Sequence, residues 1–369
     1  MHVAQVVGPG GAAVRHVRGL VTGLVAREFQ VDVYCSPVAA ERAGLAAAGA
    51  AVVPLEIGGG ARDAAAVAAL RRMLRERPAD VVHAHGLAAG AVAALARPSG
   101  LPLVVTWHTG LATHGPGGLL RRGIARSVAA SAEVNLVASA KLLAAARGLG
   151  ARDVRPALIA PPPLPAPRRT PDEVRAEFGL PPETPIVLAA GRLVERKRFD
   201  VLIEAAQRWR KRTPPPTVLL AGVGPAFRRL TAQVAITRAP VVMVGWREDM
   251  ADLLRAADVA VVTGSDVERD AFAQEALVAG TPLVSTDSGD QFELFGSAAV
   301  HVPAGDVDAL DGAVTWLLDD PDARHRLAAA ARERAASWPT EAAVLEQVVG
   351  VYAELAALAG EEPDRAGGS

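Results

Sequence analysis

Short apolar segments alternate with amphipathic stretches along this chain of 369 residues, and the alternation starts twice. Apolar runs of this length, separated by helices of roughly ten residues, are typical of βαβ units and a parallel sheet. In the first half the pattern predicts strands at 3–7, 31–35, 81–84, 103–106 and 134–138, and helices at 14–26, 63–75, 88–96 and 121–130. In the second half it predicts strands at 186–190, 218–221, 241–244, 259–262 and 282–285.

A proline-rich segment separates the two series. Seven prolines fall between Pro156 and Pro171, where neither a helix nor an inner strand can form. We therefore predict an α/β protein of two Rossmann-like, doubly wound domains, at residues 1–165 and 166–340. Open α/β sheets bind ligands beyond the carboxyl ends of their strands. We expect the binding site in a cleft where the two sets of strand ends face each other.

The end of the chain carries a different pattern. Apolar residues recur at helical spacing over 341–359, and Thr340 is a plausible N-cap for this helix. The helix is expected to pack back toward the first domain, and the polar, glycine-containing tail at 360–369 is expected to be disordered.

Cysteine content and charge limit which kinds of protein and which partners fit this sequence. A single cysteine, Cys35, excludes a disulfide framework and fits a reducing cytoplasm. No signal peptide or membrane span is expected. Residues 1–165 hold 17 basic and 9 acidic residues, whereas residues 166–369 hold 22 and 31. The basic half suggests an anionic acceptor or peripheral contact with the inner membrane face, although attraction between complementary halves would explain it equally well. No nucleic-acid partner is expected.

Lysine is scarce, because Lys141, Lys197 and Lys211 are the only lysines among 39 basic residues. Lys197 lies five positions after Arg192, between the apolar run at 186–190 and a predicted helix. The two cations therefore project beyond the carboxyl edge of the second sheet. A forked guanidinium beside a compact ammonium suits a diphosphate, which uses both bidentate and point-charge partners.

A glycine-rich segment, Gly8 to Ala13, follows the first predicted strand. It fits the dinucleotide pattern G-x-G-x-x-A, and Asp32 lies about 20 residues further on, so an NAD-dependent oxidoreductase is one alternative. The match is loose, because Asp32 lies inside a predicted strand and not at its end. Gly10 and Gly11 do allow backbone amides at a helix N-terminus to approach a phosphate.

Three histidines, His83, His85 and His108, lie at or just after two predicted strands. His108 is the expected ligand contact, because it leaves its strand into a turn that contains glycine. His83 and His85 are interpreted as structural. No second histidine or carboxylate follows at the i+3 or i+4 spacing typical of a helical metal site, so no metal is expected.

Acidic residues follow a strand of the second half, from Asp266 to Glu275. Glu275 is expected to open a helix at 275–279, where a carboxylate is stabilised by the helix dipole and can also accept hydrogen bonds from a ribose. The Asp306-x-Asp308 pair could hold a divalent metal. We interpret it as a helix N-cap followed by a first-turn acid.

Together these segments resemble the retaining glycosyltransferase family 4, which has the two-domain GT-B architecture, across nearly the whole chain. The matching motifs are Gly10-Gly11 with Arg15-His16-Val17, residues 80–86, Gly191-Arg192-Leu193 with Lys197, and residues 221–225, 244–245, 274–282 and 302–306.

The resemblance implies a role for individual residues in binding the donor and the transferred sugar. By this resemblance the diphosphate is bound by Gly10, Gly11, Arg192 and Lys197. The ribose is bound by Glu275, and the base is contacted by Trp246 or Arg247. The transferred sugar is contacted by the catalytic pair Glu268 and His108. It also implies a donor such as a UDP- or GDP-sugar, no metal, and a hydroxyl acceptor that is lipid-linked or a glycan precursor. Cations and backbone amides would stabilise the departing diphosphate.

The chain departs from the family pattern around Glu268 and Glu275, which have six residues between them where the family has seven. Glycines of that loop are replaced by Arg269, Asp270 and Ala271. A catalytically impaired nucleotide-binding paralogue is therefore an alternative. A glycoside hydrolase using the two glutamates is another, and it would need a water-filled groove between them.

Overall fold

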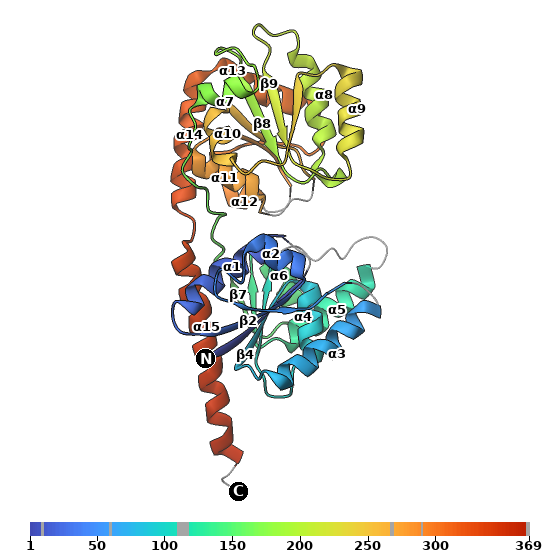
Figure 1. Ribbon diagram of the computed structural model, residues 1–369, viewed down its shortest axis with the longest axis vertical. Coiled ribbons are helices and arrows are strands. Elements are labelled where there is room, and N and C mark those ends of the chain that lie inside the picture. Colours follow the sequence, from blue (N-terminus) through green and yellow to red (C-terminus); the bar gives the residue numbers. More distant parts are fainter. Residues whose placement is uncertain (9–10, 59–60, 109–117, 266–268, 289–290, 367–369) are drawn as a thin grey trace. The chain divides into compact units, whose positions relative to one another are not determined.

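The computed structural model describes residues 1–8, 11–58, 61–108, 118–265, 269–288 and 291–366. The chain forms two compact units, which are described separately. One contains Met1–Ala160 together with Pro339–Ser369, and the other contains Pro161–Trp338 (Figure 1). The chain thus leaves the first unit after Ala160 and returns to it for its last helix.

The first unit is built on a parallel sheet of seven strands among the described residues, in the order β3-β2-β1-β4-β5-β6-β7. The strand order reverses between β1 and β4, which is the topological switch point where such sheets bind ligands. The strands are β1 His2–Val7, β2 Gln30–Cys35, β3 Ala51–Pro54, β4 Val81–His85, β5 Leu103–Trp107, β6 Val134–Val137 and β7 Val154–Pro156.

Helices cover both faces of this sheet. Helices α1, α2 and α15 bury one face, and α3, α4, α5 and α6 bury the other, where α3, α4 and α5 lie side by side (Figure 1). Their bounds are α1 Gly11–Val25, α2 Pro37–Ala43, α3 Ala61–Glu76, α4 Leu87–Ala96, α5 Gly118–Ser131, α6 Ala140–Gly148 and α15 Glu341–Ala366.

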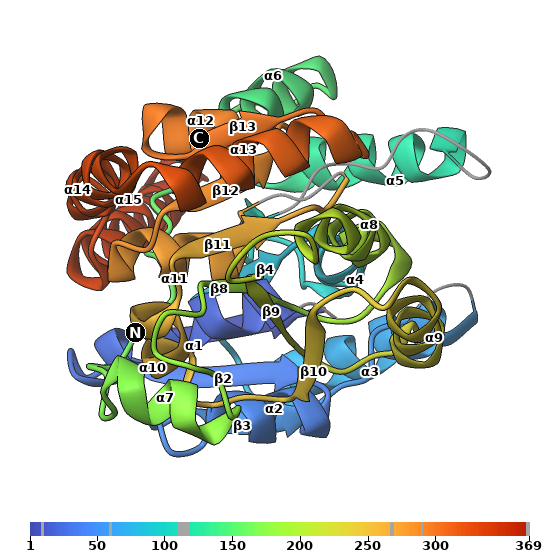
Figure 2. The same ribbon diagram turned by 90° about the horizontal axis from the view of Figure 1, so that it is seen from above.

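The second unit repeats this plan with six parallel strands in the order β10-β9-β8-β11-β12-β13, and its switch point lies between β8 and β11 (Figure 2). The strands are β8 Ile186–Ala190, β9 Thr217–Ala221, β10 Val241–Gly245, β11 Val259–Val262, β12 Leu283–Thr286 and β13 Val300–Val302.

Two groups of helices bury the faces of the second sheet. On one face pack α8 Phe199–Trp209, α9 Phe227–Thr237 and α13 Val307–Asp319. On the other pack α7 Pro171–Glu177, α10 Met250–Ala256, α11 Ala271–Ala279, α12 Gln291–Phe295 and α14 Pro321–Ala336. The short 3₁₀ turns are η1 Glu195–Lys197 and η2 Gly296–Ala298.

Side-chain caps mark several helix starts, as the sequence predicts. The Asp306 carboxylate accepts a hydrogen bond from the Ala309 amide at 2.9 Å, and the Thr340 hydroxyl accepts one from Ala343 at 3.1 Å. Each satisfies an amide that has no partner within its own helix. The Cys35 thiol is fully buried at the end of β2, and this burial raises its pKa to about 11.

Two doubly wound parallel sheets are confirmed, and every predicted strand is present. The pattern missed β3, β7 and β13, which have three or four residues each and lie at sheet edges. Two of them end in proline, which cannot donate to a ladder and is confined to such places. Helix α15 continues to Ala366, beyond the 341–359 expected for it, and the expected disorder of the tail at 360–369 stays a prediction.

Candidate active site

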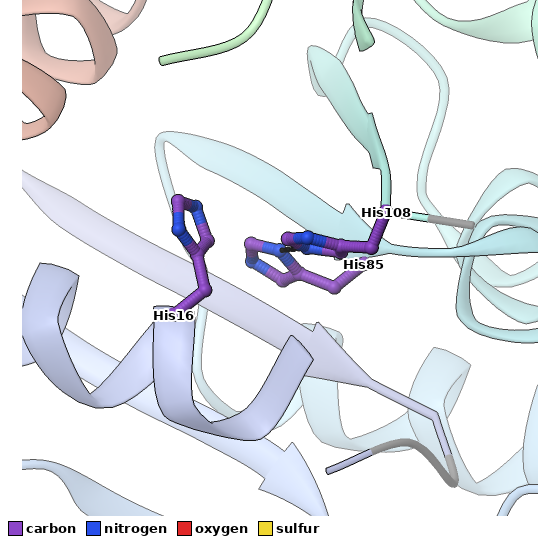
Figure 3. A group of neighbouring side chains, drawn as sticks. All are labelled: His16, His85 and His108. Carbon is purple, nitrogen blue, oxygen red and sulfur yellow. Dashed lines mark hydrogen bonds between the residues drawn. The ribbon is translucent and has the colours of Figure 1, made fainter. Parts of the chain in front are cut away.

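Three histidines meet at the carboxyl edge of the first sheet, beside its switch point. His16 lies on α1, His85 is the last residue of β4, and His108 directly follows β5 (Figure 3). His85 Nδ1 lies 3.1 Å from His108 Nε2, and the centroid of the His16 ring lies 4.9 Å from that of His108. The His16 and His108 rings meet edge to face, and the His85 and His108 rings are stacked.

These three rings could surround a metal ion, since one ring nitrogen from each lies within 4.8 Å of the others. Tetrahedral zinc with three imidazoles needs nitrogens roughly 3.4 Å apart, so His16 would have to move closer. The 3.1 Å contact between His85 and His108 is the length of a hydrogen bond, and a metal would replace its proton. The side chains present therefore allow a metal and do not require one.

A buried polar network lies beneath the histidine cluster. The Gln5 side chain donates to the Tyr352 hydroxyl at 2.9 Å, and its carbonyl oxygen lies 2.7 Å from His85 Nε2. His83 lies between Tyr352 at 2.6 Å and the Thr106 hydroxyl at 2.7 Å. Burial lowers the pKa of His83 to about 3 and holds that of His85 well below its usual value, so both rings are neutral at pH 7.

The glycine-rich segment is only partly described. Gly11 is the first residue of α1, whereas Gly10 lies outside the described residues. Asp32, the acid that a nicotinamide enzyme would use for a ribose, is buried within β2. Its two carboxylate oxygens accept hydrogen bonds from Arg77 at 2.6 and 2.7 Å. Asp32 is thus occupied by a structural ion pair, which argues against the oxidoreductase alternative.

In the second unit, Lys197 lies at the switch point of the sheet. Its ammonium pairs with the buried Asp270, which is the N-cap of α11 and follows β11. The turn η1 is held to the end of β11, because the Thr263 hydroxyl donates to the Lys197 carbonyl at 2.8 Å. The ammonium thus bridges the segments that follow the two central strands, β8 and β11.

Glycine is favoured at two positions of this edge, at Gly191 by its backbone conformation and at Gly222 also by close approach of the backbone. At Gly191 φ is 150°, and a Cβ there would lie 3.4 Å from the Lys197 nitrogen. At Gly222 φ is 142°, and a Cβ would lie 1.9 Å from the Gly191 carbonyl oxygen, which no side chain could tolerate. Arg192, between Gly191 and the 3₁₀ turn, is exposed. The loops after β8 and β9 therefore lie against each other under the lysine.

The remaining predicted residues lie on neighbouring elements. Glu275 is half-buried on α11, but this helix begins at Ala271, so Glu275 is not the helix-start acid that was expected. Capping by Asp270 explains the earlier start. Glu268 lies outside the described residues. Trp246 directly follows β10 and is 71% exposed.

Arg247 is engaged by acids of its own unit. Its guanidinium donates to Glu177 at 2.6 and 3.0 Å and to Asp249 at 2.8 and 2.6 Å. The hydrogen bond from Arg247 holds the pKa of Glu177 below its usual range. Four of the guanidinium's five N–H groups face these carboxylates, so Arg247 has little capacity left for a nucleotide.

Both halves of the chain match glycosyltransferase families. Residues 171–334 match the family described as Glycosyl transferases group 1, and residues 11–162 match a Glycosyl transferase 4-like domain. The chain belongs to the group 1 glycosyltransferase family. Its two Rossmann-like domains are those of the GT-B fold, which the solved relatives share.

Curated relatives of this group 1 protein include LpsE of Rhizobium meliloti, a lipopolysaccharide core biosynthesis glycosyltransferase, 33% identical over 42% of this chain and 45% of LpsE. D-inositol 3-phosphate glycosyltransferase of Corynebacterium diphtheriae is 29% identical over 76% of this chain and 71% of that protein. For LpsE and several other curated relatives, the alignment spans about half of the relative's length or less.

Among solved structures, HepE from Anabaena in complex with UDP has a TM-score of 0.79 and 18% identity, covering 96% of this chain and all of HepE. Sucrose-phosphate synthase from Thermosynechococcus elongatus has a TM-score of 0.79 and 20% identity, covering 97% and 100%. At these identities the likeness concerns the fold alone. Within the described part of this family member, no helix is long and apolar enough to cross a membrane.

Three residues of this group 1 protein were not expected to be part of the site. His16 and His85 join His108, and Asp270 pairs with Lys197. Local spacing could not show the histidine cluster, because its members come from three separate elements. The available signal was their position, since His16 follows β1, His85 ends β4 and His108 follows β5, and these strands are neighbours in a doubly wound sheet.

Proposed function

We propose that this chain is a retaining, metal-independent glycosyltransferase that moves a sugar from a UDP- or GDP-sugar to a hydroxyl acceptor. The observation that carries the proposal is the Lys197 ammonium, placed over the Gly191 turn at the switch point of the second sheet. Doubly wound sheets bind ligands at this point, and an ammonium is a common partner of phosphate. The likeness to HepE, solved with UDP, supports the nucleotide part.

In the proposed reaction the bond between the anomeric carbon and the diphosphate oxygen breaks, and the diphosphate leaves with the electron pair. Arg192 and Lys197 stabilise its charge, with the lysine shared between the diphosphate and Asp270. The acceptor oxygen attacks from the side of the leaving group, so the anomeric configuration is kept, and its proton goes to the departing diphosphate.

The other roles follow from where the side chains lie. Glu275 on α11 accepts hydrogen bonds from the ribose, and Trp246 contacts the base through its exposed ring. We assign the base to Trp246 and not to Arg247, because the Arg247 guanidinium is engaged by Glu177 and Asp249. His108 contacts the transferred sugar, as does Glu268.

The acceptor and the site of action are proposed from charge. Among the side chains that the structure describes, six arginines are exposed on α3 and α5, and α5 has no acidic residue along its length. Leu119 and Leu120 are 89% and 71% exposed on α5. Exposed apolar side chains among cations suit an anionic membrane surface. We therefore propose a lipid-linked or envelope-glycan acceptor, reached in the cytoplasm at the inner membrane face; the relative LpsE acts in lipopolysaccharide core synthesis.

The proposal is tested by combining binding with turnover. A thermal-shift screen over UDP, GDP, their sugar esters and NAD should raise the melting temperature only with a nucleoside diphosphate or its sugar, because such ligands bind the folded chain alone. Release of the nucleoside diphosphate should then be measured with and without EDTA. Undiminished release in EDTA supports a metal-independent transferase. Binding without release indicates the impaired paralogue, and a shift with NAD alone would overturn the proposal.

A further inference from the structure

We propose that Gln5 and Tyr352 are positioning residues for His108 and act on it through His85. The inference rests on the proposed function in one respect, namely that His108 contacts the transferred sugar. It adds two residues, from the first strand and the last helix, that fix which nitrogen of His108 carries the proton.

The hydrogen bonds that link His108, His85, Gln5 and Tyr352 all point the same way, because each residue donates to the next. The Gln5 side-chain amide donates to the Tyr352 hydroxyl at 2.9 Å, so the Gln5 carbonyl oxygen faces His85. His85 Nε2, 2.7 Å from that oxygen, must therefore carry the proton and donate. In a neutral ring the other nitrogen is then an acceptor. His85 Nδ1 thus accepts from His108 Nε2 at 3.1 Å, which places the His108 proton on Nε2.

A second set of hydrogen bonds, through His83, fixes the direction of this series. The Tyr352 hydroxyl accepts from Gln5, so its own proton is directed to His83 Nδ1 at 2.6 Å. His83 Nε2 then carries a proton and donates to the Thr106 hydroxyl at 2.7 Å. Each of these five contacts then joins one donor to one acceptor, as buried polar groups require. Reversing His108 would require the Gln5 amide to turn over and the protons of His83, His85 and Tyr352 to move together.

Burial keeps this hydrogen-bond network rigid. Tyr352, Gln5 and His83 are fully buried, and His85 and Thr106 are exposed by 2% or less. Water cannot replace a lost partner there, so a buried donor or acceptor left without one destabilises the arrangement. The stacked rings of His83, His85 and His108 prevent the imidazoles from turning independently. The edge-to-face contact between His16 and His108 adds to this packing.

The tautomer of His108 decides whether its Nδ1 accepts or donates a hydrogen bond at the proposed sugar site. In the neutral form of His108, a proton on Nε2 makes Nδ1 an acceptor, which suits a hydroxyl of the transferred sugar as a donor. The other tautomer would present a donor to the same hydroxyl. A histidine held in the wrong tautomer loses its catalytic contribution even when its position is unchanged.

The test uses the two tyrosines of the chain, both of which are fully buried in the first unit. Tyr352→Phe removes only the hydroxyl that accepts from Gln5. Tyr34→Phe is the matched control, because its hydroxyl contacts Asp32 at 3.4 Å and takes no part in the histidine network. Nitrogen chemical shifts in ¹⁵N-histidine-labelled full-length protein report the tautomer of each ring, and steady-state kinetics with the donor report kcat and KM.

We expect His108 to be the Nε2–H tautomer in the wild type and in Tyr34→Phe, and a mixture in Tyr352→Phe. The kcat of Tyr352→Phe should fall about tenfold with KM for the donor unchanged, which is equivalent to about 1.4 kcal/mol, within the range for one buried hydrogen bond. Gln5→Met, which can neither donate nor accept, should do the same. An unchanged His108 tautomer in both variants would overturn the inference. The tautomer is measured without substrate, so a wild type that turns over no donor would refute the proposed function alone.

Discussion

The ion pair between Lys197 and Asp270 links the proposed donor site to the stability of the second unit. Asp270 is 2% exposed and Lys197 is 15% exposed. Removing the lysine alone would leave a buried carboxylate without a partner, which typically costs about 3 kcal/mol or more. Loss of activity in Lys197→Ala would therefore not separate catalysis from folding.

We predict that Lys197→Met combined with Asp270→Asn retains the melting temperature within a few degrees and loses donor turnover by about 100-fold or more. Asparagine replaces aspartate well as a helix N-cap, and no buried charge remains. Thermal melts and donor-release rates would check this, with the exposed Lys211→Met as control. Wild-type turnover in the double variant would remove Lys197 from the mechanism.

The buried His83 predicts how stability depends on pH. In the unfolded chain a histidine takes up a proton below its ordinary pKa of about 6.5, whereas burial lowers the pKa of His83 to about 3 in the folded protein. The stability contributed by neutral His83 is therefore present above pH 6.5 and is lost as the pH falls toward 3. Between pH 7 and pH 5 it amounts to about 2 kcal/mol.

Urea unfolding at these two pH values measures the effect. His83→Gln should reduce the loss of unfolding free energy by about 2 kcal/mol, because glutamine does not titrate. His325→Gln, at an exposed histidine, should leave the loss as it is. An equal pH dependence in wild type and His83→Gln would contradict the buried neutral state of this ring.

At the scale of elements, α1 and α15 approach each other through a glycine. A Cβ built at Gly23 would lie 2.5 Å from the Leu345 side chain of α15. Gly23→Ala should therefore separate the helices and destabilise the protein by about 1–3 kcal/mol. Gly350→Ala on α15 is the control, since a Cβ there meets nothing within 4 Å.

The control variant should become more stable by about 0.5–1 kcal/mol, because alanine is the better helix former. Denaturant unfolding of both variants gives the comparison. Equal stabilities would mean that the Gly23 contact is relieved without displacing α15.

The long central elements could be predicted from the pattern, whereas the edges and the assembled site could not. Strands such as β8 and β11 are continuous apolar runs because both of their faces are covered by helices. The edge strand β3 has only three apolar residues before its proline, which is too short a run to stand out. Lys197 and His108 could be found because each follows one predicted strand. Their partners Asp270 and His85 come from other strands, so only the strand order brings them together.

At the scale of the whole molecule, the proposed membrane surface makes a prediction about charge. Arg121 and Arg122 are exposed on α5 beside Leu119 and Leu120. Reversing both arginines to glutamate should weaken binding to anionic vesicles by tenfold or more, at about 1 kcal/mol for each charge near the surface. Co-sedimentation with phosphatidylglycerol–phosphatidylcholine vesicles measures this, and zwitterionic vesicles should bind neither form.

The matched control is reversal of Arg228 and Arg229, which are exposed on α9 of the second unit. This control should bind as the wild type does. Equal binding of wild type to zwitterionic and anionic vesicles, or equal losses in both double variants, would rule out a specific surface on α5.

Tyr352 comes from a helix that returns to the first unit after the whole second unit has been traversed. During synthesis, Gln5 and His83 leave the ribosome hundreds of residues before the hydroxyl that joins them, although domains usually fold in the order in which they are made. During synthesis the first unit should therefore stay incompletely folded until α15 is made. A chain truncated after Trp338 should show faster amide exchange in β1 and β4 than the full chain does. The histidine site would become competent only after α15 has been made.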